Sequence, residues 1–455
     1  MCWGVFGMQE NRNFSRSADE LKELAGCVLG MSARHGATEC DVDITESMGS
    51  GVTVRLGALE AIESRRDTSV TVRVYFGKRK GHATTTDLSH DALEQAVAAA
   101  VRIARLSAED SCAGLAETAA FATAFPELDL YHPWHIATSD AIDIAARCEN
   151  AALSVDRQRI PNSDGAAVAS HIAQSIYANS LDFVGYRRGS RHTVSCAVIA
   201  QENGSMQRDK WYTHARAVGD LEDVVDVGNR AGKRALARLH PRRISTEERP
   251  VLFESGVAAG LVNHFASAIN GLSLYSGSSF LANSLGQQIF SPIVNIVEDP
   301  LLPRGLASAA FDAEGVATRR RNLLQDGVVT GYLLSTYTAR KLGLKTTGNA
   351  GGVHNLMVTP TAGGHDDMLQ KLGTGLFITE LAGQGVNNMT GEYSRGASGF
   401  WVENGVVAFP VEGITISGNL RNMYKRIAAI GSDVDRRSGI QVGSILIDGV
   451  SIAGT

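Results

Sequence analysis

Glycine is concentrated in the second half of this chain, and its placement constrains the fold more than any other feature. Of 48 glycines, 18 lie in residues 1–240 and 30 in residues 241–455. They follow no repeat and only 10 prolines accompany them, which excludes a collagen-like or low-complexity chain. Glycine adopts left-handed backbone conformations freely and lets backbones approach closely. The second half is therefore expected to hold tight turns and bulges.

Three dipeptides in the second half carry the strongest short-range signal for hairpins. Asp326-Gly327, Asn404-Gly405 and Asp448-Gly449 each lie between apolar runs, and Asx-Gly pairs suit type I′ turns. Short helices are expected at 256–269, 337–342, 366–372 and 420–430. We predict a strand-rich, mostly antiparallel domain with short helices over residues 241–455.

Residues 1–240 alternate between helical and strand periodicity, which is typical of an α+β fold. Helices are expected from about residue 19, after Ser89, and at 140–155 and 221–237; strands are expected at 41–46, 52–56, 69–75, 167–177, 183–188, 193–201 and 207–217. We predict two α/β sandwich-like domains, an N-terminal one at 1–125 and a central one at 126–240. The basic stretch Arg238–Arg249 is the predicted linker to the third domain.

Charge and cysteine usage limit the partners and the compartment. The net charge of -5 argues against direct binding of nucleic acid, which requires a basic surface. Met1–Ser15 lacks the pattern of a signal peptide, and no run of about 18 uncharged apolar residues indicates a membrane span. The six cysteines all precede residue 200 and include no C-x-x-C pair. These features predict a cytoplasmic protein with reduced thiols.

The histidines of the second half are the candidate metal ligands. His264 lies within a predicted helix beside Asn263, while His354 and His365 each follow a pair of glycines. A lone helical histidine is usually a packed residue, and no carboxylate or cysteine completes a zinc-binding spacing. A nucleophile elbow, a phosphate-binding loop and a dinucleotide fingerprint are all missing from the sequence. The residues alone therefore indicate no self-evident active site.

Several segments of the last two hundred residues together carry a family resemblance. They are 278–281, 284–286, 305–308, 311–312, 336–345, 351–355, 373–376, 379–381, 383–386, 393–397 and 399–405. Through them the chain resembles the TldD/PmbA family, in its PmbA (TldE) branch, over nearly its full length. The resemblance implies a role in proteolysis. TldD-type members look like zinc peptidases, and PmbA-type members pair with a TldD subunit to trim unfolded peptides, such as peptide-antibiotic precursors and a labile antitoxin.

The resemblance also implies where zinc would be held. In TldD-type members the ligands are a His-Glu-x-x-x-His helix and a cysteine near the C-terminus. Here the two histidines fall on Asn263 and Ala268, the glutamate falls on His264, and no cysteine follows Cys196. Asparagine is a poor zinc ligand, alanine is none, and an imidazole cannot replace the carboxylate base. We therefore expect no metal ligands and no catalytic residues in this chain, with zinc held by a partner subunit.

The leading hypothesis is a non-catalytic subunit of a cytoplasmic TldD–TldE metallopeptidase, whose glycine-lined strand edges hold an extended peptide. The residues expected to line that groove are Gly351, Gly352, His354, Asn355, Gly383, Gly385, Tyr393 and Arg395. The expected partners are a TldD-type subunit and unfolded peptides, without a membrane or direct nucleic acid; self-association in isolation stays open. Two alternatives also stay open. One is an autonomous metallopeptidase with an unconventional site near His264 and His354, and the other is a binding protein that acts indirectly on DNA gyrase.

Overall fold

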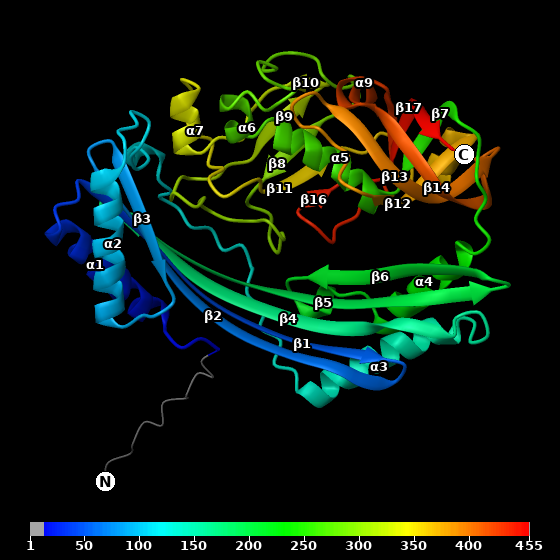
Figure 1. Ribbon diagram of the computed structural model, residues 1–455, viewed down its shortest axis with the longest axis horizontal. Helices are drawn as coiled ribbons and strands as arrows, with labels where there is room; N and C mark the ends of the chain where they lie inside the picture. Colours follow the sequence, from blue (N-terminus) through cyan, green and yellow to red (C-terminus); the bar gives the residue numbers. More distant parts are fainter. Residues whose placement is uncertain (1–12, 455) are drawn as a thin grey trace, which may run out of the picture. The chain divides into compact units, whose positions relative to one another are not determined.

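The computed structural model describes residues 13–454, so Cys2 and most of the segment Met1–Ser15 lie outside it. The chain forms two compact units (Figure 1). The first contains the residues up to 50 together with 63–121 and 171–190, and the second contains 51–62, 122–170 and the residues from 191 onward. The three-domain division at 1–125, 126–240 and 241–455 stays a prediction. The five described cysteines, Cys27, Cys40, Cys112, Cys148 and Cys196, are free thiols.

A six-stranded sheet with the order β3-β2-β1-β4-β5-β6 runs through the first half of the chain. Its strands are β1 (Glu39–Arg55), β2 (Ala58–Phe76), β3 (Arg79–Thr85), β4 (Asn162–Asn179), β5 (Val184–Glu202) and β6 (Ser205–Ala215). The prediction that 41–46 and 52–56 are separate strands was wrong, as was the division of β5. Apolar alternation lapses at Gly49–Gly51, but the backbone stays extended there, so β1 is continuous.

Two helices of the first unit follow the sequence pattern. They are α1 (Ala18–Arg34) and α2 (His90–Leu106), and their apolar stripes share one core with β2. A capping box between Ser17 and Glu20 begins α1. Gly81 of β3 lets α2 lie close, because a Cβ atom there would come 2.1 Å from the carbonyl oxygen of Ala100. The predicted helices are therefore confirmed.

Helices α3 (Thr138–Ser154) and α4 (Val224–Ala237) pack closely against each other in the second unit. Gly228 and Gly232 of α4 face α3, and a Cβ atom on Gly228 would lie 2.1 Å from the carbonyl oxygen of Cys148. Small residues at this crossing allow the two backbones to approach. The helices share an apolar core with Val194, Cys196 and Val198 of β5, which places α4 beside the end of the sheet that carries β6.

The remainder of the second unit contains two more sheets. One has the order β14-β13-β12-β7-β17-β15, and the other has the order β10-β9-β8-β11-β16. The first comprises β7 (Glu247–Phe253), β12 (Gly375–Ala382), β13 (Glu392–Glu403), β14 (Val406–Asn419), β15 (Ile427–Ile430) and β17 (Ile445–Ala453). The second comprises β8 (Ile296–Asp299), β9 (Arg321–Gln325), β10 (Val328–Val329), β11 (Asn355–Val358) and β16 (Ile440–Gln441). Only the β7–β12 and β11–β16 pairs are parallel among the pairings of these strands, which confirms a mostly antiparallel domain.

Short helices complete this region, and all of them except the one at 271–275 were predicted from the sequence. They are α5 (Ser255–Ala268), α6 (Gly271–Tyr275), α7 (Thr336–Lys341), α8 (His365–Leu372) and α9 (Leu420–Lys425). Leu261 and Phe265 of α5 share one core cluster with residues of both sheets, and Figure 1 draws α5 beside them. β14 also pairs with β17, so β7, β12, β13, β14 and β17 close on themselves. α5 therefore packs one face against the core of this region.

Two of the three predicted hairpin turns are confirmed. Asp326-Gly327 joins β9 to β10 with φ values of 49° and 76°, and Asn404-Gly405 joins β13 to β14 with φ values of 54° and 77°. The prediction for Asp448-Gly449 was wrong, because this pair lies inside β17. The register shifts there between Ile447 and Val450, so Gly449 serves a bulge instead of a turn.

Two further predictions were wrong at their boundaries. The proposed linker Arg238–Arg249 begins with Arg238, which is only 9% exposed, and ends inside β7, which starts at Glu247. The helix expected at 420–430 stops at Lys425, and Ile427–Ile430 forms β15. In both cases a strand of the sheet β14-β13-β12-β7-β17-β15 overrides the local pattern.

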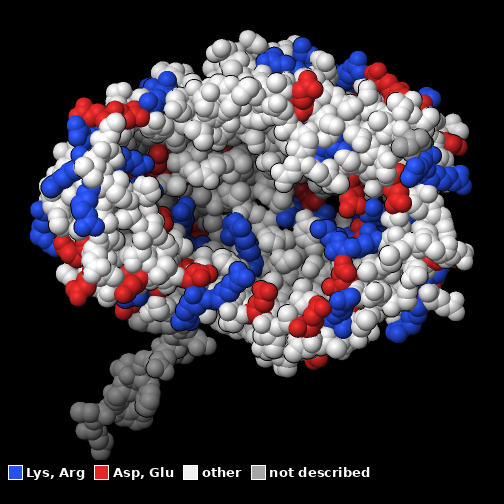
Figure 2. All heavy atoms as spheres, viewed as in Figure 1, with Lys and Arg blue, Asp and Glu red and all other residues white. Residues whose placement is uncertain are grey.

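The surface of the described chain carries charges of both signs. Basic and acidic side chains are interspersed over the face shown in Figure 2. No helix within residues 13–454 combines the length and the apolar character needed to cross a membrane.

Candidate functional site

The three α5 positions for which the family resemblance implied a metal-binding role lie in unlike environments. Asn263 is exposed, His264 is half-buried and Ala268 is fully buried. One amide, one imidazole and one methyl group supply a single good zinc donor, so these residues do not fit a zinc ion. Within residues 13–454, no three His, Cys, Asp or Glu side chains are grouped so as to hold a metal.

His264 lies instead against two residues of β13. Its ring makes an edge contact with the ring of Tyr393, with 6.1 Å between centroids and 79° between planes. Burial lowers the pKa of His264, and the nearby Arg395 guanidinium lowers it further. Burial also raises the pKa of Tyr393 to about 12. We call His264, Tyr393 and Arg395 the α5–β13 cluster, which holds a neutral imidazole and a protonated phenol near pH 7.

The glycine loop after β12 lies beside this cluster. The amide of Ser394 donates to the carbonyl oxygen of Gly385 at 2.6 Å, and a Cβ atom on Gly385 would lie 1.8 Å from the carbonyl oxygen of Ser394. Only glycine permits that approach, while Gly383 has a φ of +77° and open space around it. The structure thus brings the predicted residues Gly383, Gly385, Tyr393 and Arg395 together. β12 and β13 are hydrogen-bonded to a neighbouring strand on both sides, so any contact with a peptide here would come from side chains or the loop.

The other predicted loop, 351–355, serves to hold the chain together. The buried carboxylate of Glu298 accepts from the amide of His354 at 3.0 Å, from Asn349 at 2.7 Å and from Arg321 at 2.9 Å. The His354 ring nitrogens lie 2.9 Å from the carbonyl oxygen of Gly348 and 3.3 Å from that of Ala307. Because both ring nitrogens face carbonyl oxygens, His354 is not arranged to hold a metal.

Asn355 fixes the neighbouring loop 305–308. It is fully buried, accepts from the amide of Ala307 at 2.9 Å and donates to Ser308 Oγ at 2.7 Å and to the carbonyl oxygen of Asp299 at 2.8 Å. Gly351 and Gly352 adopt φ values of +95° and +128°, which only glycine adopts without strain. A direct role in substrate binding stays a prediction for Gly351, Gly352, His354 and Asn355.

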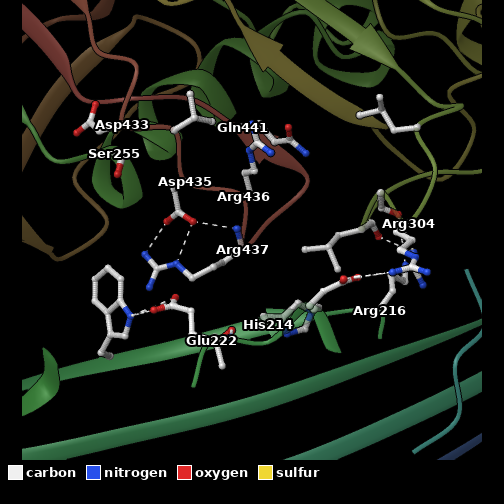
Figure 3. A pocket seen from close by; sticks show the side chains of 18 of the residues that line it. His214, Arg216, Glu222, Ser255, Arg304, Asp433, Asp435, Arg436, Arg437 and Gln441 are labelled. Atoms are coloured by element: carbon white, nitrogen blue, oxygen red, sulfur yellow. Dashed lines mark hydrogen bonds and ion pairs between the residues drawn. The ribbon is translucent and has the colours of Figure 1, made fainter. Parts of the chain in front are cut away.

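A cavity of about 800 Å³ lies within the second unit, close to the loop that Asn355 holds (Figure 3). Its walls come from the end of β6, the segment 220–222, α4, the first residue of α5, the loop 302–306 and the loop 433–441. Its charged lining residues are Arg216, Arg230, Arg304, Arg436, Arg437, Asp220, Glu222, Asp433 and Asp435. None of the residues predicted to line the groove is among its lining residues.

One wall of the cavity is built around the indole of Trp211. The Arg437 guanidinium lies 3.9 Å from that ring and 4.4 Å from the ring of Tyr212, and it pairs with Asp435 at 2.7 Å. Arg230 lies 4.5 Å from the same indole, whose nitrogen donates to Glu222. Cation–π contacts and matched carboxylates therefore fix the positions of these cations.

The opposite wall carries a buried cation. Arg216 donates to the carbonyl oxygens of Gly305 and Leu306, at 3.2 Å and 2.8 Å. Burial and the neighbouring Arg191 lower the pKa of Arg216 to about 10, so it stays charged at neutral pH. Burial, and then Arg191 and Arg216, lower the pKa of His214. This wall therefore presents a positive field and a neutral imidazole.

Sequence reasoning missed the cavity because its lining comes from segments that are far apart in the chain. A weak local signal was present. The aromatic pair Trp211-Tyr212 lies within a predicted strand, and Arg436-Arg437 follows two aspartates. Neither pattern indicates a site until the fold brings the two together.

Comparisons with known proteins identify the family. Residues 40–104, 131–239 and 246–454 match domain 1, the central domain and the C-terminal domain of the PmbA/TldA metallopeptidases. The chain is 46% identical to Metalloprotease PmbA of Escherichia coli O157:H7, over 91% of this chain and 92% of that protein.

Solved structures agree with this result. A crystal structure from Bacteroides thetaiotaomicron, described as a candidate modulator of DNA gyrase, matches with a TM-score of 0.91 and 25% identity, over 96% of this chain and 99% of that one. TldE from Thermococcus kodakarensis has the same fold, with a TM-score of 0.81 and 19% identity, over 95% of this chain and all of that one. The chain therefore belongs to the PmbA/TldD family of metallopeptidases.

Proposed function

We propose that this chain is the TldE-type subunit of a cytoplasmic TldD–TldE metallopeptidase that trims or degrades unfolded peptides, and that it binds no zinc itself. The observation that carries the proposal is the donor set on α5. An exposed Asn263, a half-buried His264 and a fully buried Ala268 occupy the positions where TldD-type members hold zinc. Zinc catalysis requires deprotonated N, S or O ligands and an open position for water.

The surroundings of His264 support the same conclusion. Its ring is engaged by Tyr393 and lies near the cation of Arg395, which opposes the binding of a further cation beside it. His354, the other histidine of the autonomous alternative, has carbonyl oxygens at both ring nitrogens. The proposal therefore assigns zinc to a TldD-type partner and leaves peptide handling to this chain.

Reconstitution tests the proposal. The purified chain alone, a TldD-type partner alone, and the two mixed are each given an unfolded peptide, and its cleavage is followed by mass spectrometry. We expect zinc-dependent cleavage by the mixture, none by this chain alone, and a rate within about twofold when this chain carries His264→Gln. Strong zinc-dependent cleavage by this chain alone, lost in the His264→Gln variant, would contradict the proposal.

A further inference from the structure

The arginines of the cavity differ in whether a carboxylate already balances their charge. Three are matched on the wall: Arg230 by Glu222 at 3.5 Å, Arg304 by Asp220 at 3.1 Å, and Arg437 by Asp435 at 2.7 Å. Arg216 is held by two backbone carbonyl oxygens. The fourth carboxylate, Asp433, accepts from the amide and the hydroxyl of Ser444, at 2.9 Å and 3.0 Å. Most charges in the cavity are therefore already engaged.

Arg436 differs from the other four arginines. It is exposed, lines the cavity, and has neither an ion pair nor a hydrogen bond among the described residues. Its neighbour Arg437 is fixed by Asp435 and by the rings of Trp211 and Tyr212. Figure 3 marks hydrogen bonds or ion pairs at Asp435 and Arg437 but none at Arg436. The segment 433–441 thus fixes Arg437 in the wall of the cavity and leaves Arg436 available to a ligand.

The residues that line the cavity carry a small excess of positive charge. Five arginines and four carboxylates line it, and Arg191 adds a further positive charge near His214. Burial is the main cause of the lowered pKa of His214, and Arg191 and Arg216 lower it further. The volume of about 800 Å³ falls in the range of sites for small ligands and accommodates a few residues of a peptide.

We propose that this cavity binds a carboxylate of a peptide, with Arg436 as the residue that pairs with it. The inference rests on the proposed function, which supplies a peptide as the ligand. A guanidinium recognises a carboxylate through two parallel N–H donors, and this geometry suits an α-carboxylate and an acidic side chain equally. Among the arginines that line the cavity, Arg436 is the one whose guanidinium N–H groups have no partner among the described residues.

Fluorescence anisotropy of the full chain tests the proposal with three labelled hexapeptides of alanine and serine. One has a free carboxylate, one is amidated, and one is amidated but contains a single glutamate. We expect a peptide that carries a carboxylate to bind about tenfold or more tightly than the uncharged amide, since charge-assisted hydrogen bonds are strong. Arg436→Gln should remove that preference, and Arg436→Lys should retain part of it.

The matched control is Arg319→Gln, an exposed arginine outside the cavity, which should leave the preference unchanged. Tight binding of the glutamate peptide shows that the cavity accepts an acidic side chain, and tight binding of the free-carboxylate peptide alone identifies the α-carboxylate; either result supports the proposal. Equal binding of acid and amide, no binding at all, or a preference that survives Arg436→Gln overturns it. If the reconstituted pair still cleaves peptide in those cases, only the carboxylate site falls and the proposed function stands.

Discussion

Two regions of the second unit contrast in how they use polar chemistry. The α5–β13 cluster includes the helix position to which our proposal assigns zinc in TldD-type members, and there a neutral imidazole packs against a buried phenol. The cavity lies outside that position, yet five arginines and four carboxylates line it. The difference teaches that one folded unit packs a histidine against aromatic and apolar neighbours in one region while it gathers charged side chains around a cavity in another.

The largest expected effect tests whether the α5 position is packed. Ala268 is fully buried, so Ala268→His forces a larger polar side chain into the core and should lower the free energy of unfolding by about 3 kcal/mol. Urea denaturation measures the change. The control Ser267→His, exposed on the same helix, should stay within about 0.5 kcal/mol. A stable Ala268→His protein that binds zinc would remove the contrast between the two regions.

The next effect tests the wall of the cavity. Trp211→Ala removes the ring that Arg437, Arg230 and Arg234 contact, at 3.9, 4.5 and 5.4 Å, and should lower the free energy of unfolding by about 2 kcal/mol. Thermal unfolding follows the loss. Trp211→Phe keeps an aromatic face and should recover more than half of it. Equal losses for the two variants would mean that cation–π contacts do not hold this wall.

A smaller effect tests whether loop 351–355 supports the cavity. Asn355→Ala removes three buried hydrogen bonds to the segments at Asp299 and at 307–308, and should lower stability by about 1–2 kcal/mol. It should also weaken peptide binding in the anisotropy assay, because the loop 302–306 lines the cavity. The control Asn322→Ala is exposed and should change neither quantity. Unchanged peptide affinity in Asn355→Ala would show that Asn355 does not position the loop 302–306 for peptide binding.

The smallest effect is a pH dependence at the α5–β13 cluster. The pKa of His264 is lowered in the folded state by burial and by Arg395, so the unfolded chain binds more protons below about pH 6.5. The stability that comes from the neutral ring is therefore present above that pH and is lost as the pH falls through the lowered pKa. Arg395→Gln should raise the pKa of His264 and reduce this loss. Titration of the imidazole signals by NMR gives the pKa directly, and no upward shift would show that Arg395 does not act on His264.

The sequence predicted the fold best where local chemistry decides it. Asp326-Gly327 and Asn404-Gly405 form turns because both of their residues adopt positive φ. Asp448-Gly449 has the same residue types but lies in a strand between two partners, and pairing overrides the turn signal. The turn at Leu56-Gly57 was missed because leucine rarely adopts its φ of 51°. Asn203-Gly204 also has the residue types of a hairpin turn, but no turn was predicted there.

The candidate site shows a different limit. The mismatch at Asn263, His264 and Ala268 could be identified by the family resemblance, because it concerns residue types. The exposure of Asn263, the contact of His264 with Tyr393 and the burial of Ala268 required the fold. The cavity could not be predicted at all, since Trp211 and Arg437 are more than two hundred residues apart in the sequence and contact each other only in the folded chain.

The zinc content of this chain tests the central claim most directly. The chain is purified without its partner, exposed to excess zinc, dialysed, and analysed by mass spectrometry for metal, beside its His264→Ala variant. The donor set on α5 predicts far less than one zinc per chain in both proteins. One tightly held zinc per chain, lost in His264→Ala, would contradict the account.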